Sequence, residues 1–232
     1  MAPNAKQIRD RLKQELKNDG NPGNRSGQVY WDIREQILDG RYHPGDKLII
    51  RDLAAELCVS MTPVREALYR LIAEGALEAR ERQSARIPLL SIADIEEIWN
   101  IRLRLEPYAV EQAVPLLTSL DIDRLTRYSE EVADAKKHLS TKEISQLVRQ
   151  FNFHLYRSAA LPRLAKMIED IWASSMPTLG WLLEHEKRDD IAAKYRQDLL
   201  KAAKRRDPVA AAQCITDDIK GSFQRVLTAM NI

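Results

Sequence analysis

Cysteine, glycine and proline are scarce in this chain of 232 residues, which contains two cysteines, eight glycines and ten prolines. The two cysteines, Cys58 and Cys214, lie far apart and belong to no Cys-x-x-Cys pair. This argues against a disulfide scaffold and a thiolate zinc site, and it fits a reducing compartment. The few glycines and prolines, together with many Ala, Leu, Glu, Lys and Arg residues, favour helical structure.

Long hydrophobic runs are also missing. The longest stretch without a charged residue, 171–183, has 13 residues and contains Ser, Pro and Gly, whereas a membrane-spanning helix needs about 20 apolar residues. The first residues, MAPNAKQIRDRLKQELK, contain no apolar core of a secretion signal. We therefore predict a cytoplasmic protein with no membrane partner.

An excess of charge of one sign is nearly absent, since the formal net charge is +2. Residues 1–88 carry 15 Lys and Arg against 13 Asp and Glu, and residues 89–232 carry 21 of each kind. Charge alone therefore does not identify a nucleic-acid-binding protein, and such a prediction must rest on where particular side chains lie.

The motifs of common enzyme classes are missing as well. The sequence contains no Glu-x-x-His pair of the carboxylate-metal bundles, no Gly-x-Ser-x-Gly, no phosphate-binding loop and no dinucleotide fingerprint. We predict that the chain is not an enzyme. The alternatives to a DNA-binding regulator are a helical-bundle enzyme and a ligand-free architectural protein. Salt-dependent binding to random duplex DNA would exclude the enzyme.

The sequence pattern changes near Pro88 and predicts two domains after an extension. Residues 1–27 end in the turn-rich segment NDGNPGNRSG and are predicted to form a flexible N-terminal extension. Residues 28–88 show three short helices and two short strands around a polar turn, and residues 89–232 show only helical periodicity. The predicted helical blocks are 91–117, 121–139, 141–160, 162–184, 188–205 and 208–230, which together form a bundle with room for a ligand.

Residues 51–72, RDLAAELCVSMTPVREALYRLI, have the layout of a helix-turn-helix. Ala54 supplies the small residue where the two helices cross. Thr62 and Pro63 are predicted as the N-cap and the first residue of the second helix. Because the N-terminal residues of such a helix contact bases, Arg65 can pair with guanine. An ordinary surface charge is the alternative role for Arg65.

The hairpin-like segment that follows completes a winged helix-turn-helix, with the wing at residues 80–86. Arg80, Arg82 and Arg86 can reach phosphates or the minor groove, and the alternative for them is a solvated face. Arg51 opens the helix before the turn and is placed for backbone or groove contact. The predicted fold is therefore mostly α, with an N-terminal winged helix-turn-helix domain and a C-terminal all-α six-helix bundle.

Residues 29–77 resemble the DNA-binding domain of the GntR superfamily of bacterial transcription regulators. The matching segments are Ile33-Arg34-Glu35-Gln36-Ile37-Leu38-Asp39-Gly40, Pro44-Gly45-Asp46-Lys47-Leu48, Arg51-Asp52-Leu53-Ala54, Val59-Ser60, Thr62-Pro63-Val64-Arg65-Glu66-Ala67-Leu68, Leu71 and Glu74-Gly75. The resemblance implies a homodimer on a palindromic operator, with contacts from Arg51, Thr62 and Arg65. The residues that we assign to DNA binding are Arg51, Ser60, Met61, Thr62, Pro63, Arg65, Arg82 and Ser84.

Three positions depart from the family pattern. Met61 stands where the family usually has Arg or Lys, so one DNA contact is predicted to be lost. Cys58 stands at a turn position that is commonly Gly, and it must take or avoid a strained backbone conformation. Ser84 and Ala85 stand at the predicted wing tip, which usually holds Gly, so the wing is predicted to sit differently on the minor groove.

The C-terminal bundle resembles the FCD effector-binding domain of the FadR-like branch, and its six helices resemble the VanR-type subgroup. The matching residues are Arg102-x-x-x-Glu106, Phe153-His154 and the turn 207–211. Many members hold a metal with one Asp and three His, and the corresponding residues here are Gln150, His154, Arg196 and Asp218. A guanidinium cannot ligate a metal, and zinc needs three or four ligands. We therefore predict no metal and no other cofactor.

At a position where relatives have a metal ligand, this chain has a permanently charged side chain. This positive charge points to an anionic effector. The planar fork of Arg196 matches a carboxylate, so we predict a small organic acid held by Arg196 with help from Arg102 and His154. Gln150 and Asp218 complete the predicted effector site. The alternatives are that Arg196 and Asp218 neutralise each other and that His154 is an ordinary core histidine. The sequence thus predicts a ligand-responsive transcription regulator, expected to be a repressor, that binds double-stranded DNA as a homodimer.

Overall fold

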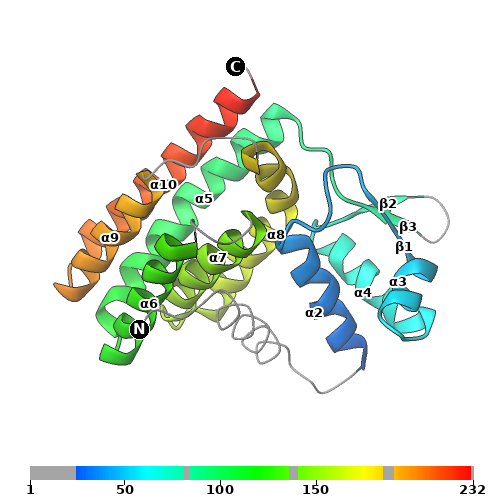
Figure 1. Cartoon of the computed structure of the whole chain (residues 1–232), viewed down its shortest axis with the longest axis horizontal. Coiled ribbons are helices and arrows are strands. Elements are labelled where there is room, and N and C mark those ends of the chain that lie inside the picture. The colour runs from blue at the N-terminus through cyan, green and yellow to red at the C-terminus, as the bar shows by residue number, and fades with distance from the viewer. Residues whose placement is uncertain (1–24, 81–83, 136–140, 185–190, 231–232) are drawn as a thin grey trace. The chain divides into compact units, whose positions relative to one another are not determined.

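The computed structural model describes residues 25–80, 84–135, 141–184 and 191–230 (Figure 1). Tertiary contacts divide the chain into two compact units. The winged unit contains the described residues within 25–95 and 170–181, and the bundle unit contains those within 96–169 and 182–230. None of the described helices combines the length and the apolar character that a membrane span requires.

Three helices and a small sheet make up most of the winged unit. The elements are α2 (Arg25–Leu38), β1 (Lys47–Ile49), α3 (Ile50–Glu56), α4 (Met61–Ala73), β2 (Glu78–Arg80) and β3 (Ser84–Arg86). Helices α2 and α3 both pack against α4. The apolar positions that recur at helical spacing are buried, namely Val29, Ile33, Ile37, Leu53, Val64, Ala67, Leu68 and Leu71. The predicted three-helix arrangement is confirmed.

Two helices begin earlier than predicted. Helix α4 begins at Met61, and its N-cap is Ser60, which is extended and makes no side-chain cap hydrogen bond. The prediction of Thr62 as the N-cap is therefore wrong. Pro63 is the third helical residue, where it is still tolerated because the N–H groups of the first turn have no intrahelical acceptor. Helix α2 begins at Arg25, so the end of the predicted extension is helical.

The three strands form an antiparallel sheet in the order β1-β3-β2. Ala85 of β3 lies opposite Leu48 of β1, and both residues are buried. The two predicted strands are confirmed. The third strand, β1, comes from an apolar run that was too short to be assigned to a strand or a helix from its sequence. The placement of Ser84 and Ala85 at the wing tip is wrong, because both pair within the sheet. Residues 81–83, which include Arg82, lie outside the described residues.

The turn between α3 and α4 contains a strained residue. Cys58 has a φ of 54°, in the left-handed region that glycine adopts readily and other residues adopt at a cost of about 1–2 kcal/mol. The N–H groups of Cys58 and Val59 donate to the carbonyls of Ala55 and Ala54, at 3.3 and 3.0 Å, and close α3. Of the two options that the sequence left open, Cys58 takes the strained conformation.

From residue 92 on, every regular element of the described chain is a helix. The helices are α5 (Ile92–Ala113), α6 (Ser119–Ala135), α7 (Thr141–Arg157), α8 (Pro162–Glu184), α9 (Ile191–Lys204) and α10 (Pro208–Ala229), with the 3-10 turn η1 (Val114–Leu116) after α5. The six predicted blocks are confirmed. Side-chain caps occur, for example, at the starts of α6 and α10. Asp121 accepts from the Thr118 N–H at 2.8 Å before α6, and Asp207 accepts from the Ala210 N–H at 3.0 Å at α10.

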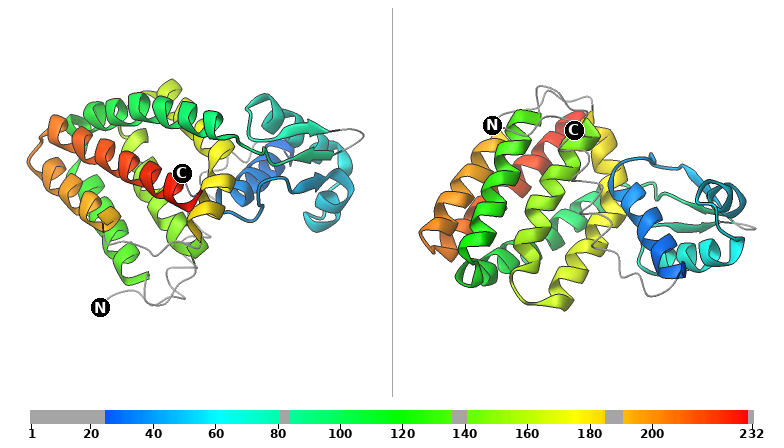
Figure 2. Two further views of the ribbon diagram at one scale, coloured as in Figure 1. Left: turned by 90° about the horizontal axis from the view of Figure 1, so that it is seen from above. Right: turned by 60° about the horizontal axis from the view of Figure 1, so that its bottom comes forward.

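In the bundle unit, α9 packs along α10, and α6 contacts both α7 and α9. Figure 2 shows α9 in orange beside α10 in red. The Trp99 indole of α5 donates to the carbonyl of Ile219 at 2.9 Å, and its ring lies 5.1 Å from that of Phe223. The Arg102 guanidinium lies 5.5 Å from the Trp99 ring. Trp99 therefore brings Arg102 of α5 close to α10.

Candidate functional site

The exposed face of α4 presents three of the residues predicted to contact DNA, Met61, Thr62 and Arg65. Met61 and Tyr69 are 47% and 66% exposed. Thr62 and Glu66 are also exposed, and Arg65 is half-buried. The opposite face of the helix belongs to the core of the winged unit. The stripe Met61, Arg65 and Tyr69, at four-residue spacing, is therefore free to meet a partner.

A side-chain network holds α4 against α2. The Tyr30 hydroxyl donates to Glu74 Oε2 at 2.6 Å, and Arg70 Nε donates to Glu74 Oε1 at 3.2 Å. The Arg70 guanidinium lies 3.7 Å from the centre of the Tyr30 ring. Burial and the hydrogen bond to Glu74 raise the pKa of Tyr30, so its hydroxyl remains a donor. No local sequence pattern predicts this network, because Tyr30 and Glu74 lie 44 positions apart.

The arginines of the winged unit differ in whether a carboxylate holds them. Three are held by glutamates: Arg41 by Glu56, Arg70 by Glu74 and Arg86 by Glu78. Arg51 and Arg65 have no hydrogen bond or ion pair with any residue that the structure describes. These two charges can therefore bind phosphate or base without the loss of a contact within the protein.

The wing offers fewer available cations than predicted. Arg86 is half-buried, and its Nη2 lies 2.8 Å from Glu78 Oε2, so this ion pair competes with a phosphate contact. Arg82 and the side chain of Arg80 lie outside the described part of the chain. Ser84 is half-buried in β3, opposite Ile49. The DNA contacts of Arg82 and Ser84 stay predictions.

Met61→Arg is expected to strengthen binding to duplex DNA, because a guanidinium at this exposed start of α4 can reach a phosphate. The slope of log affinity against log salt should steepen by about 1, and a titration at several salt concentrations measures it. Met167→Arg, at a methionine of the bundle unit that is 54% exposed, controls for charge. Weaker binding by Met61→Arg would show instead that Met61 makes its own apolar contact, for instance with a thymine methyl.

The bundle unit contains a buried hydrogen-bonded group around Glu106. Arg102 Nε donates to Glu106 Oε1 at 2.6 Å, and the Tyr156 hydroxyl donates to Glu106 Oε2 at 2.5 Å. Glu106 is fully buried, and Arg102 is 8% exposed. Burial and the charge of Glu106 raise the pKa of Tyr156 well above its usual value, so the hydroxyl keeps its proton. Arg102, predicted to contact the effector, therefore already has a buried counter-ion.

Arg196 of α9 is buried without such a partner. The residue is 7% exposed, and its Nε has no hydrogen-bond partner among the described residues. Burial lowers the pKa of Arg196, and the charge of Asp218 opposes the shift, but a guanidinium stays protonated in proteins. A buried charge without a direct counter-ion is costly. Among the residues predicted to contact the effector, Arg196 is the buried cation that lacks a direct counter-ion among the described residues.

Asp218 of α10 shares the electrostatic neighbourhood of Arg196. Burial raises the pKa of Asp218, and the charges of Arg196, Arg225 and Arg102 act in the opposite direction. No hydrogen bond or ion pair joins Asp218 to any residue in the described ranges. Arg196 and Asp218 thus attract each other without direct contact, and the direct ion pair considered as an alternative does not form. Three of the five predicted effector residues, Arg102, Arg196 and Asp218, share one charged neighbourhood.

His154 and Gln150 of α7 have different surroundings. His154 Nε2 lies 3.1 Å from Asp121 Oδ1 of α6. Burial lowers the pKa of His154, and the charge of Asp121 opposes the shift. Gln150 Oε1 is buried without a hydrogen-bond partner in the described part of the chain. His154 therefore has a carboxylate partner of its own, whereas the Gln150 carbonyl is an unused acceptor.

The positions where the resemblance places a metal site do not fit a metal. Arg196 would bring a positive charge towards the ion and has no lone pair to offer. His154 is engaged with Asp121, and only Asp218 remains as an anionic ligand. No group of three or more His, Cys, Asp or Glu side chains within the described ranges could hold a metal ion.

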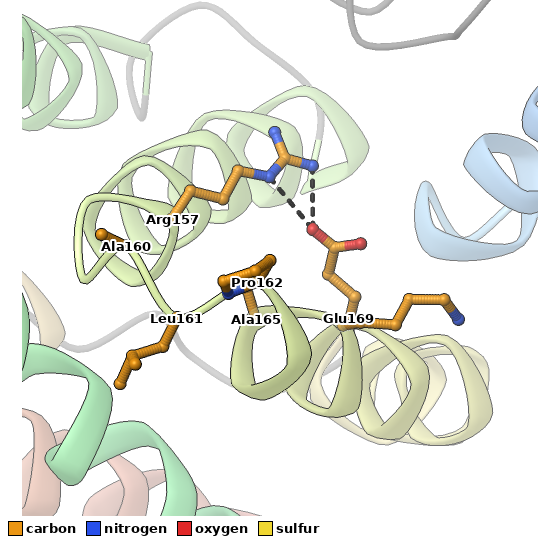
Figure 3. Close-up of a pocket in the computed structure, with 7 residues that line it drawn as sticks. Arg157, Ala160, Leu161, Pro162, Ala165 and Glu169 are labelled. Carbon is orange, nitrogen blue, oxygen red and sulfur yellow. Dashed lines mark hydrogen bonds and ion pairs between the residues drawn. The ribbon is translucent and has the colours of Figure 1, made fainter.

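A surface pocket of about 310 Å³ lies where α7 ends and α8 begins (Figure 3). It is lined by Arg157, Ala160, Leu161, Pro162, Ala165, Lys166 and Glu169. Arg157 Nη2 lies 3.0 Å from Glu169 Oε1, so the guanidinium at the pocket is already paired. None of the predicted effector residues lines this pocket. No sequence pattern predicts this pocket, because the turn that forms it contains Ala160 at a φ of 54°, a conformation that alanine rarely adopts.

Known proteins match both parts of the chain. Residues 25–87 match the family described as "Bacterial regulatory proteins, gntR family", and residues 97–221 match the FCD domain. The HTH-type transcriptional regulator McbR of Escherichia coli (strain K12) is 34% identical over 82% of this chain and 87% of that protein. The gluconate operon transcriptional repressor of Bacillus subtilis (strain 168) is 32% identical over 72% of this chain and 67% of that protein.

A solved structure of E. coli McbR/YncC shares the fold. The TM-score is 0.84 at 30% sequence identity, and the match covers 89% of this chain and 98% of that one. The FCD match alone spans more than half of the 232 residues. The relatives carry the names of transcription regulators, which confirms the prediction that the chain is not an enzyme. The chain belongs to the GntR family and is a transcriptional regulator with an N-terminal helix-turn-helix domain and a C-terminal FCD domain.

Proposed function

We propose that this regulator is a cytoplasmic repressor, that it binds a palindromic operator as a homodimer, and that a small organic acid in the FCD domain modulates this binding. Repression is supported by the relative named as the gluconate operon transcriptional repressor. The observation that carries the effector part is the buried guanidinium of Arg196, which has no partner among the described residues.

The DNA part of the proposal places the start of α4 in the major groove. Arg65 then forms a bidentate pair with a guanine, and Arg51 binds the backbone. The free N–H groups at the start of α4, beside Thr62, suit a phosphate. Two copies of the chain would bind two inverted half-sites, whose centres lie about one helical turn of DNA, or a multiple of it, apart.

The effector part of the proposal follows from the geometry of a guanidinium. Arg196 presents parallel N–H donors, and a carboxylate supplies two acceptors and one negative charge at matching positions. Binding would therefore satisfy Nε and give the buried charge a counter-ion. Arg102 and His154 already have carboxylate partners. We assign them a supporting role and give the direct contact to Arg196.

The effector acts on the operator only if it binds the two states of the protein with different affinities. By linkage, an acid that weakens operator binding by some factor is itself bound more weakly by that factor on the operator complex. Titration of the acid into free and operator-bound protein tests this reciprocity. A ligand-free architectural protein would show no thermal stabilisation by any small acid.

We expect purified protein to contain no stoichiometric zinc, nickel or manganese, because Arg196 occupies a position where the family resemblance places a metal ligand. Elemental analysis by mass spectrometry measures the content directly. A chelator should leave the unfolding midpoint unchanged, since no metal contributes to folding. One equivalent of bound metal per chain, with a chelator-sensitive midpoint, would contradict the proposal.

A further inference from the structure

Three large apolar side chains are exposed where the links α5–α6 and α9–α10 come together in the bundle unit. Leu116 of η1, Leu120 of α6 and Val209 of α10 are 55%, 67% and 69% exposed. Arg206 Nη1 donates to the Val114 carbonyl at 3.0 Å and so joins the two links. Figure 2 shows both links at the same end of the unit. Leu116, Leu120 and Val209, which we call the end patch, therefore lie together at this end.

A basic run lies beside the end patch. Residues 204–206 are Lys-Arg-Arg, all three are exposed, and none forms an ion pair with a residue that the structure describes. Asp207, the next residue, is half-buried at the N-cap of α10. Asp123 and Arg124, the exposed charges that follow on α6, have opposite signs. No exposed residue of the two links, 114–120 and 204–209, is acidic, so the charge beside the end patch is positive.

This combination of apolar and basic side chains limits what can cover the end of the unit. A second copy that docks through the same face would bring the two basic runs together, and like charges oppose such a contact. Residues 1–24 carry five Lys and Arg against three Asp and Glu, so this segment of the chain also has the wrong charge. Three side chains offer far less area than the roughly 1,000 Å² of a stable protein interface, which suits a short segment of a partner.

We infer that the end patch and residues 204–206 form a docking site for a short segment of another protein that carries apolar and acidic side chains. The apolar side chains of the segment cover Leu116, Leu120 and Val209, and its carboxylates pair with the charges of the basic run. This inference goes beyond the proposed function, because the docking site involves neither the operator nor the effector.

Selection of random peptides displayed on phage against the immobilised full chain tests the inference. The enriched peptides are expected to combine apolar residues with Asp and Glu. A synthetic copy of the most enriched peptide should bind the full chain less tightly as salt rises, because exposed charges are screened. Enrichment of basic peptides, or of no peptide, would overturn the inference.

Substitutions at the site show where the synthetic peptide binds. Leu120→Ser is expected to weaken its binding about tenfold, because an apolar contact is lost, and Arg205→Ser about threefold, because one exposed ion pair is lost. Met167→Ser and Arg163→Ser are the matched controls, since both residues are exposed on α8 outside the two links, and they should leave the affinity unchanged. Both substitutions at the site concern exposed residues, so the unfolding midpoint should stay the same.

Three results would overturn the inference. The first is an affinity for the peptide that Leu120→Ser leaves unchanged. The second is a smaller assembly of Leu120→Ser in analytical ultracentrifugation, which would identify a second copy as the occupant. The third is binding of the unaltered chain to phosphatidylserine vesicles that Leu120→Ser loses, which would identify a lipid surface as the occupant.

Discussion

Arg65→Ala is expected to weaken operator binding by about 1–3 kcal/mol per half-site and to relax the base preference at one position of each half-site. The reason is that Arg65 lies on the outward face of α4 and has no partner within the described residues. Its whole hydrogen-bonding capacity is then directed to DNA. Binding titrations with the operator and with single-base variants of it measure both effects.

Arg41→Ala is the matched control for Arg65→Ala. Both substitutions remove one positive charge from the winged unit, but Arg41 is paired with Glu56. The control should therefore leave base preference unchanged and alter operator affinity little. If Arg65→Ala binds the operator with unchanged affinity and preference, Arg65 is an ordinary surface charge and the recognition face of α4 has been assigned wrongly.

Arg196→Met is expected to raise the free energy of unfolding of the ligand-free protein by about 1–3 kcal/mol, because it replaces a buried charge that has no direct counter-ion with an apolar side chain. The same variant should lose all stabilisation by small organic acids and keep its operator affinity. Denaturant unfolding with and without an acid measures the first two effects. A functional residue whose removal stabilises the fold is the expected result at a ligand site.

Arg102→Met provides a contrast with the same chemical change. Arg102 is hydrogen-bonded to the fully buried Glu106, so its removal leaves a buried carboxylate without its counter-ion. This variant should lose about 3–5 kcal/mol of stability. If Arg196→Met is destabilised as strongly as Arg102→Met, or if it still responds to the acid, Arg196 is a structural residue and the effector site lies elsewhere.

Periodicity predicted most of the fold, because apolar side chains at helical spacing record which face of each helix is buried. The start of α4 was placed two residues late, because Thr62 and Pro63 look like an N-cap and a first helical residue, whereas Ser60 ends the extended turn. Strand β1 has three residues, too few for a period. It exists because Leu48 pairs with Ala85, 37 positions away in the sequence.

The sequence predicted which residues face outward on α4. It did not predict which charged side chains already have a partner within the protein. The Tyr156–Glu106 and His154–Asp121 contacts join residues 50 and 33 positions apart, and no local pattern encodes such pairs. These contacts separate the predicted site residues into two kinds. Arg102 and His154 have carboxylate partners, whereas Arg65 and Arg196 have none among the described residues. Only tertiary structure makes that distinction, and it determines where a ligand can bind.

The central claim is that two copies of this chain read an operator with their α4 helices. Selection of bound duplexes from a random DNA pool, followed by measurement of the mass of the complex, tests it most directly. The account predicts enriched sequences with two inverted half-sites, bound by two chains, with a guanine at the position that Arg65→Ala relaxes. Enrichment of a single asymmetric site bound by one chain, or no enrichment at any salt concentration, would contradict it.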